Sequence, residues 1–231
     1  MIKKNTPFNG FAPETLNFLS NIEANNNKSW FDTHRADYQS FLLDPLLSLT
    51  LDLSDGLLNI DPQFIVGKRT ISRIHRDTRF SNDKAPYKSR MWITFKGPRK
   101  DWADSPAYFF EINKDSYRYG MGFYAASPET MRKFRQAIDE KPQAFQTAVS
   151  FYSKQNIFVL EGEKYKKTFD TSKPSDIQEW YQRKNFYLIC TKKDHQRLFS
   201  KALVDDLLSG YNMIAPLYHY LLKLKHRELT T

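Results

Sequence analysis

The spacing of apolar residues changes partway along the chain, and this change restricts the fold more than any other feature of the sequence. Up to about residue 58, apolar residues recur every three or four positions, as at Leu46, Leu49, Leu53 and Leu57. This spacing places them on one side of an α-helix. From Thr70 onward the period falls to two, which is typical of strands with one face on a core. The sequence therefore predicts helices first and a sheet afterwards.

Local signals divide the N-terminal part into three helices. The first is expected over residues 13–24 and ends at the asparagines of residues 25–27. Asn27 is suited to cap the second helix, because an Asn side chain can accept a hydrogen bond from a free backbone N–H. Asp44 and Pro45 predict the start of the third helix, with Asp44 as its N-cap and Pro45 in its first turn.

Three alternating runs then predict consecutive antiparallel strands joined by short turns. Their inward residues are Met91, Ile93 and Phe95, then Tyr108, Phe110 and Ile112, then Tyr117, Tyr119, Met121 and Phe123. Gly120 and Gly122 share the other face of the third run. Their missing side chains allow the close approach of a helix or a ligand, and a helix is the commoner cause.

The C-terminal part mixes helices with short strands. The expected elements are helices from Ser127 and from Pro142 to about Lys154, strands at 158–160 and 186–191 flanking a helix at 176–184, and a final helix at about 199–221. Pro216 lies inside the final helix, where it removes one backbone hydrogen bond and produces a kink.

We therefore expect a single α+β domain over residues 1–231. Its parts are a helical part (about 13–58), a sheet part (about 69–124) and a mixed part (about 127–228). An antiparallel meander of about five to six strands packs against the N-terminal helices and the long kinked C-terminal helix.

Several classes of protein lack support in the sequence. Cys190 is the sole cysteine, so neither an intramolecular disulfide nor a cysteine-based metal site can form. The histidines do not occur at metal-ligand spacing, and no nucleophile elbow, Gly-rich phosphate loop or dinucleotide fingerprint is present. We expect no metal and no cofactor. No signal peptide or apolar run of about 18 residues is found, so we expect a cytoplasmic protein without membrane contact.

The positive charge of the chain is concentrated in one segment. Residues 68–100 contain eleven Lys or Arg and two Asp, which gives +9, the net charge of the whole chain. The other residues carry 24 basic and 24 acidic side chains and sum to zero. An excess of this kind indicates a negatively charged partner for the segment.

Within this segment, the stretch from Arg73 to Lys88 is expected to form a strand end and the loop after it. Loops that leave a rigid sheet commonly carry binding groups. Guanidinium and ammonium groups both suit phosphate or carboxylate. We therefore expect an anion site with the binding residues Arg73, Arg76, Arg79, Lys84, Tyr87 and Lys88.

Three residues of the same stretch are candidates for proton transfer. His75, beside several arginines, would be neutral and able to act as a base. Asp77 and Asp83 are the other acid–base candidates. The alternative is structural: each Asp pairs with one arginine and ties down the loop. Two carboxylates among eleven cations leave most of the charge unpaired, which favours the anion site.

Four motifs together resemble the uncharacterised family called domain of unknown function 2461. They are Asn25-Asn26-Asn27-Lys28-Ser29-Trp30-Phe31, Tyr38, the stretch Arg73–Lys88, and Gly120-x-Gly122-Phe123-Tyr124. The likeness runs from about Phe11 to Leu221, and Arg135 and Pro216 also match the family pattern. The resemblance implies an intracellular α+β protein of bacteria or fungi. It assigns no activity, ligand or catalytic residue.

Three functions fit these observations. The first is binding of a phosphate-bearing small molecule or nucleotide by the Arg- and Lys-rich stretch, with phosphoester chemistry as an extension. The second is nucleic-acid binding by the basic segment Lys68–Lys100, with Trp92, Trp102 and Tyr108 stacking on bases. The third is a non-catalytic structural or protein-interaction domain. The unpaired charge favours the first.

Overall fold

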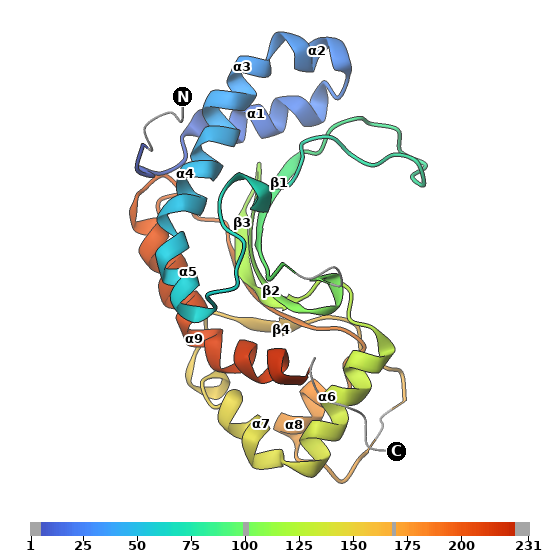
Figure 1. Ribbon diagram of the computed structural model, residues 1–231. Coiled ribbons are helices and arrows are strands. Elements are labelled where there is room, and N and C mark those ends of the chain that lie inside the picture. The colour runs from blue at the N-terminus through green and yellow to red at the C-terminus, as the bar shows by residue number, and fades with distance from the viewer. Residues whose placement is uncertain (1–5, 99–101, 168–169, 225–231) are drawn as a thin grey trace. The chain divides into compact units, whose positions relative to one another are not determined.

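The computed structural model describes residues 6–98, 102–167 and 170–224 (Figure 1). The chain divides into two units. Unit 1 consists of Met1–Phe95, Phe109–Tyr119 and Thr191–Ser209. Unit 2 consists of Lys96–Tyr108, Gly120–Cys190 and Gly210–Thr231.

The fold is α+β with an antiparallel five-stranded sheet, as the change of period predicts. The strands are β1 (Arg90–Phe95), β2 (Pro106–Asn113), β3 (Tyr117–Phe123), β4 (Val159–Glu161) and β5 (Tyr187–Lys192). Their order is β1-β2-β3-β5-β4. The meander is therefore confirmed for the first three strands. The later pair reverses its order, because β5 lies next to β3 and pairs antiparallel with β4.

Helices fill the N-terminal part of unit 1, in blue to cyan in Figure 1. They are α1 (Pro13–Ala24), α2 (Lys28–Thr33), α3 (Arg35–Asp37), the π-helical turn η1 (Tyr38–Leu43), α4 (Asp44–Asp52), α5 (Ser54–Ile60) and the 3₁₀ turn η2 (Lys68–Thr70). The Asn27 side chain accepts a hydrogen bond from the Trp30 N–H at 3.0 Å, so its capping role is confirmed. The stripe of Leu46, Leu49, Leu53 and Leu57 is fully buried.

The prediction that Asp44 is an N-cap is wrong. The chain is already helical before it, because η1 runs directly into α4 and Asp44 is the first residue of α4. The Asp44 N–H donates to Gln39 O, a bond that spans five residues and widens the turn. Pro45 lies in the first turn of α4, where a missing N–H costs little.

The sheet part begins later than the sequence indicates. Residues 71–89 form isolated antiparallel bridges, Ile71 with Ile93 and His75 with Tyr87, where a strand was expected. The inward residues of β1, β2 and β3 are buried as predicted. The turn between β2 and β3 is closed by Asn113, whose Oδ1 accepts from the N–H groups of Asp115 and Ser116.

Unit 2 contains α6 (Pro128–Glu140), α7 (Pro142–Ala148), the 3₁₀ turns η3 (Trp102–Asp104) and η4 (Tyr152–Lys154), and α8 (Ser175–Tyr181). The final helix, α9 (Ala202–Leu224), runs from unit 1 into unit 2 and contains Pro216. Ser127 caps α6 by accepting from the Thr130 N–H. α7 ends earlier than predicted, at Ala148, and is followed by η4.

An aromatic cluster forms the core of unit 2. The rings of Phe134, Phe145, Trp180 and Phe186 lie with centroids 5.1–5.8 Å apart in successive pairs. All four are at most 2% exposed, and Cys190 on β5 is equally buried. Arg183 is buried beside α8, where its guanidinium donates to the carbonyls of Leu160 and Gly162 and pairs with Glu179.

Gly120 and Gly122 permit a close approach, but a helix does not make it. A Cβ at Gly120 would lie 1.8 Å from Leu188 O, and one at Gly122 would lie 2.3 Å from the Tyr187 Cβ. The approaching group is the backbone of β5. The expectation of a helix at this strip is therefore wrong, and the glycines serve strand-to-strand packing.

Within the described ranges, helices are either too short or too polar to cross a membrane.

Candidate functional site: the basic hairpin of unit 1

The stretch singled out by its charge folds into a two-stranded ribbon, which we call the basic hairpin (residues 71–93). Its arms are joined by hydrogen bonds from Ser72 N to Trp92 O at 2.8 Å and from Lys88 N to Ile74 O at 2.9 Å. A third bond, from Arg76 N to Pro86 O, closes the ribbon before the loop of residues 77–85. The ribbon extends away from β1 in Figure 1.

The hairpin is held by the turn between α1 and α2. Asn26 Nδ2 donates to Tyr87 O at 3.0 Å, and the Tyr87 N–H donates to Asn26 Oδ1 at 2.9 Å. The Tyr87 ring is buried and stacks on Phe31 at 4.3 Å between centroids. Two motifs separated by some sixty positions thus meet in unit 1. Tyr87 therefore serves mainly to attach the hairpin to the turn between α1 and α2, and less to line a pocket. Burial raises the pKa of its phenol.

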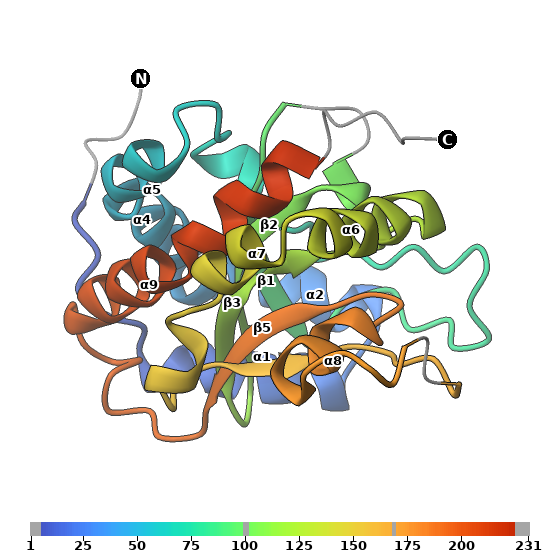
Figure 2. The ribbon, with the colours of Figure 1, turned by 90° about the horizontal axis from the view of Figure 1, so that it is seen from below.

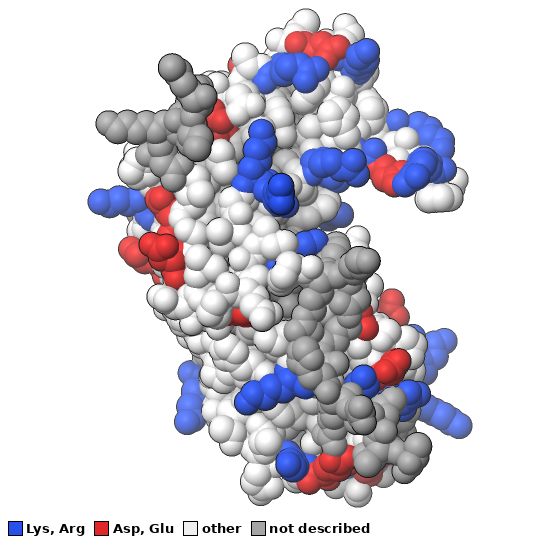
Figure 3. All heavy atoms as spheres, in the orientation of Figure 1, with Lys and Arg blue, Asp and Glu red and all other residues white. Residues whose placement is uncertain are grey.

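Two of the three predicted binding arginines pair with the two acidic residues of the hairpin. Arg79 contacts Asp77 with two hydrogen bonds, Nε to Oδ1 at 3.0 Å and Nη2 to Oδ2 at 2.7 Å. Arg76 pairs with Asp83. In each case the structural alternative describes the geometry. In Figure 3 the basic side chains of this loop are interspersed with an acidic one.

These pairs also decide what the two carboxylates can do. The hydrogen bonds of Arg79 lower the pKa of Asp77 to about 2. The hydrogen bond from Arg76, with one from the Ala85 N–H, lowers the pKa of Asp83. Both groups are ionised near neutral pH, so neither can donate a proton there, and each is a weak base.

Two further residues of the predicted site, Lys84 and His75, contact neighbouring groups of unit 1. Lys84 Nζ donates to Thr78 O at 3.0 Å, which closes the loop. His75 is exposed, and its ring lies 5.2 Å from the Tyr87 ring and 6.0 Å from the Phe31 ring. Packing against these two rings positions the imidazole near the point where the two arms of the hairpin meet the loop of residues 77–85.

A second group of cations lies closer to β1 and is paired differently. Lys88 Nζ lies 4.6 Å from the centroid of the Trp92 ring and donates to the backbone carbonyl of Arg73. Burial, and then the positive charges of Arg73 and Arg90, lower the pKa of Lys88. We call Arg73, Lys88 and Arg90 the cation cluster.

Only one member of the cation cluster forms an ion pair with a described residue, although the charge of Arg73 also contributes to the lowered pKa of Asp77. Arg90 Nη1 lies 4.0 Å from Glu111 Oε1, and the same oxygen accepts from Arg118 Nε at 2.8 Å. Among the described residues, no carboxylate pairs with Arg73 or Lys88. The cluster therefore keeps a net positive charge, whereas the charges of Arg76 and Arg79 are neutralised by their aspartates.

Comparison with known proteins gives the chain a family. The family described as "Conserved hypothetical protein (DUF2461)" matches residues 14–220. The chain belongs to this family. A search of curated proteins finds no match to this DUF2461 chain. The matched residues include Asn26 and Tyr87, whose motifs are joined by the two hydrogen bonds described above.

Sequence reasoning missed Arg90 as a residue of this DUF2461 site, and it offered Trp92 only as a ring that stacks on bases. A signal for them exists. Lys88, Arg90 and Trp92 alternate with the buried Tyr87 and Met91, so they share the other face of an extended segment. In the part of the chain that the structure describes, no group of three or more His, Cys, Asp or Glu side chains could hold a metal ion.

Proposed function

We propose that this protein binds a phosphate-bearing small molecule or nucleotide, and that the cation cluster of Arg73, Lys88 and Arg90 holds the phosphate. The observation that carries the proposal is geometric: Lys88 Nζ donates to the Arg73 carbonyl, lies beside the Trp92 ring and pairs with no carboxylate of the described residues. Burial first, and then the positive charges of Arg73 and Arg90, disfavour the charged lysine, and a bound dianion counters both effects. Arg76 and Arg79, which were candidates from the sequence, contribute less, because each already neutralises an aspartate.

The residue types of the cluster suit the proposed ligand. Two guanidinium groups offer planar forks of N–H donors to phosphate oxygens, and the ammonium adds a compact charge. Trp92 supplies an apolar surface beside the ammonium. We assign no catalytic step, because the acids of the hairpin are held ionised by their arginines.

The test is a titration of the full chain with ATP, pyrophosphate and inorganic phosphate by isothermal calorimetry. Arg73→Ala and Lys88→Ala should each weaken binding at least about tenfold, since a charged hydrogen bond contributes about 1.5–3 kcal/mol. Arg79→Ala is the matched control, because Arg79 is in the same hairpin but pairs with Asp77. Equal losses for Arg73→Ala and Arg79→Ala, or no binding by any of the three compounds, contradict the proposal.

The proposal also fixes a pH dependence. A bound anion stabilises protonated Lys88 and so raises its pKa from the lowered value of the free protein. Binding then takes up protons in the alkaline range, and the affinity falls as pH rises through the pKa of free Lys88. Calorimetric titrations across that range should show this fall for the natural chain and a flatter profile for Lys88→Gln.

A second candidate is nucleic-acid binding, and one observation favours it. Phe80, in the loop of the hairpin, is 95% exposed, and the Arg79 guanidinium lies 5.7 Å from its ring. An exposed ring beside cations can stack on a base. The affinity for single-stranded RNA should then fall steeply with salt, from a Kd on the order of 10⁻⁴ to 10⁻⁶ M at physiological salt, and Phe80→Ala should weaken it. Absence of RNA retention even at low salt excludes this function.

A further inference from the structure

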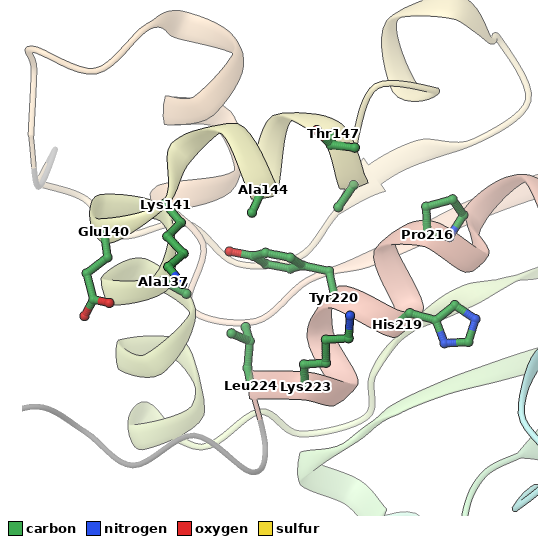
Figure 4. A pocket seen from close by; sticks show the side chains of 11 residues that line it. Ala137, Glu140, Lys141, Ala144, Thr147, Pro216, His219, Tyr220, Lys223 and Leu224 are labelled. Carbon is green, nitrogen blue, oxygen red and sulfur yellow. The ribbon is translucent and has the colours of Figure 1, made fainter.

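Unit 2 contains a cavity of about 760 Å³ between α6, α7 and the last turns of α9 (Figure 4). Its volume lies within the range of about 300–1,000 Å³ that small-molecule sites occupy. The three helices also lie together in Figures 1 and 2. The lining residues that matter most are Lys141, Ala144, Pro216, Tyr220, Lys223 and Leu224.

The interior of the cavity is mainly apolar. Small side chains line the side of α6 and α7, because Ala137, Ala144 and Ala148 extend no further than Cβ. From α9, the Tyr220 side chain extends across the cavity towards Ala144 (Figure 4). Its ring lies 5.8 Å from the Phe145 ring of the core, measured between centroids. Leu224 adds apolar surface at one end.

Two cations enter the cavity from different elements. Lys141 comes from the corner between α6 and α7, and Lys223 comes from the last turn of α9. Neither lysine forms an ion pair with a residue that the structure describes. His219 lies on the same side as Lys223 (Figure 4). Glu140 is the acidic residue of the lining, so the two lysines leave the cavity with a positive excess.

We infer that this cavity binds an aliphatic carboxylate of medium chain length. The hydrocarbon chain lies on Tyr220, Ala144 and Leu224, and the carboxylate is held by the positive charge that Lys141 and Lys223 give to the lining. An apolar body with a single negative end complements a mainly apolar lining with a positive excess. The inference goes beyond the proposed function and is independent of it, because the cation cluster belongs to unit 1.

The test is saturation-transfer NMR and a chemical-shift titration of the ¹⁵N-labelled full chain with octanoate. 1-Octanol is the matched uncharged compound. Octanoate should bind at least tenfold more tightly than octanol, and shifts should concentrate on residues of α7 and the end of α9. The double variant K141Q/K223Q should bind octanoate at least tenfold more weakly and octanol unchanged.

Two further variants separate the site from general effects. Ala144→Phe should weaken binding of both compounds at least tenfold, because its ring, at an exposed position of α7, covers the surface opposite Tyr220 on which the hydrocarbon chain lies. Lys154→Gln removes an exposed lysine elsewhere in unit 2 and should change nothing. Each variant is first checked for an unchanged circular dichroism spectrum. Equal affinity for octanoate and octanol, an unaltered affinity in Ala144→Phe, or no binding of octanoate to the natural chain overturns the inference.

Discussion

At the scale of single residues, the hairpin contains two kinds of cation that composition cannot distinguish. Arg76 and Arg79 each pair with an aspartate of the loop, whereas Arg73 and Lys88 form no ion pair with a described residue. Exposed pairs of the first kind contribute little to stability but remove charge from any partner. These pairs are therefore detected best by measuring the pKa values of their aspartates.

The Asp77 carboxyl should titrate at about pH 2 in the folded chain, against a usual value of 3.8. Because the folded pKa is the lower one, the stabilising effect of the pair is complete above the usual value and is lost as pH falls through about 2. In Arg79→Gln the midpoint should move back towards 3.8. Carbon-detected NMR of the Asp side chains measures both values, and a midpoint that Arg79→Gln does not change rules out the pair.

Asn26 has a different importance, because its carboxamide makes both hydrogen bonds to the backbone of Tyr87. Asn26→Ala leaves two backbone groups of a buried residue without partners, so it should lower the free energy of unfolding by about 1–3 kcal/mol. Asn25→Ala is the control, since Asn25 is exposed and bonds only within its own turn. Its effect should stay within about 0.5 kcal/mol. Urea unfolding of both variants measures the difference, and equal effects contradict the anchoring role.

At the scale of elements, close strand packing accounts for the two glycines of β3. Gly120→Ala should cost on the order of 3 kcal/mol, because the added Cβ meets the backbone of Leu188 and a backbone cannot rotate away. Gly97→Ala is the matched change, since a Cβ there meets nothing within 4 Å. Thermal unfolding should show a large loss for the first variant and almost none for the second. A Gly120→Ala protein as stable as the natural chain would be inconsistent with this packing.

The same elements show which features a sequence can predict. Caps such as Asn27 and Ser127 depend on neighbours three residues away, so local patterns were sufficient. The position of β5 beside β3 depends on packing between distant segments, and alternation along β5 does not encode it. The site follows the same rule. The cation-rich stretch was predictable, but its division into paired and unpaired members depends on where the loop turns, and the bond between Asn26 and Tyr87 depends on tertiary contact.

At the scale of the whole molecule, β2, β3 and α9 each contribute residues to both units. A strand cannot lose half of its length without disturbing its remainder, so we expect the two units to unfold in one cooperative transition, as the prediction of a single domain requires. Far-ultraviolet circular dichroism and near-ultraviolet absorbance should give the same midpoint in urea. Two separate midpoints would instead identify independent domains.

Cys190 allows the opening of the sheet to be measured by thiol labelling. The chain has this one thiol, and it is 2% exposed on β5. A thiol-specific dye can react only when β5 leaves its neighbours, so the rate of labelling in the absence of denaturant measures how often that part of the sheet opens. The molecule thus reports its own local unfolding without an engineered probe, and the labelling rate should rise in Gly120→Ala well before the fold as a whole is lost.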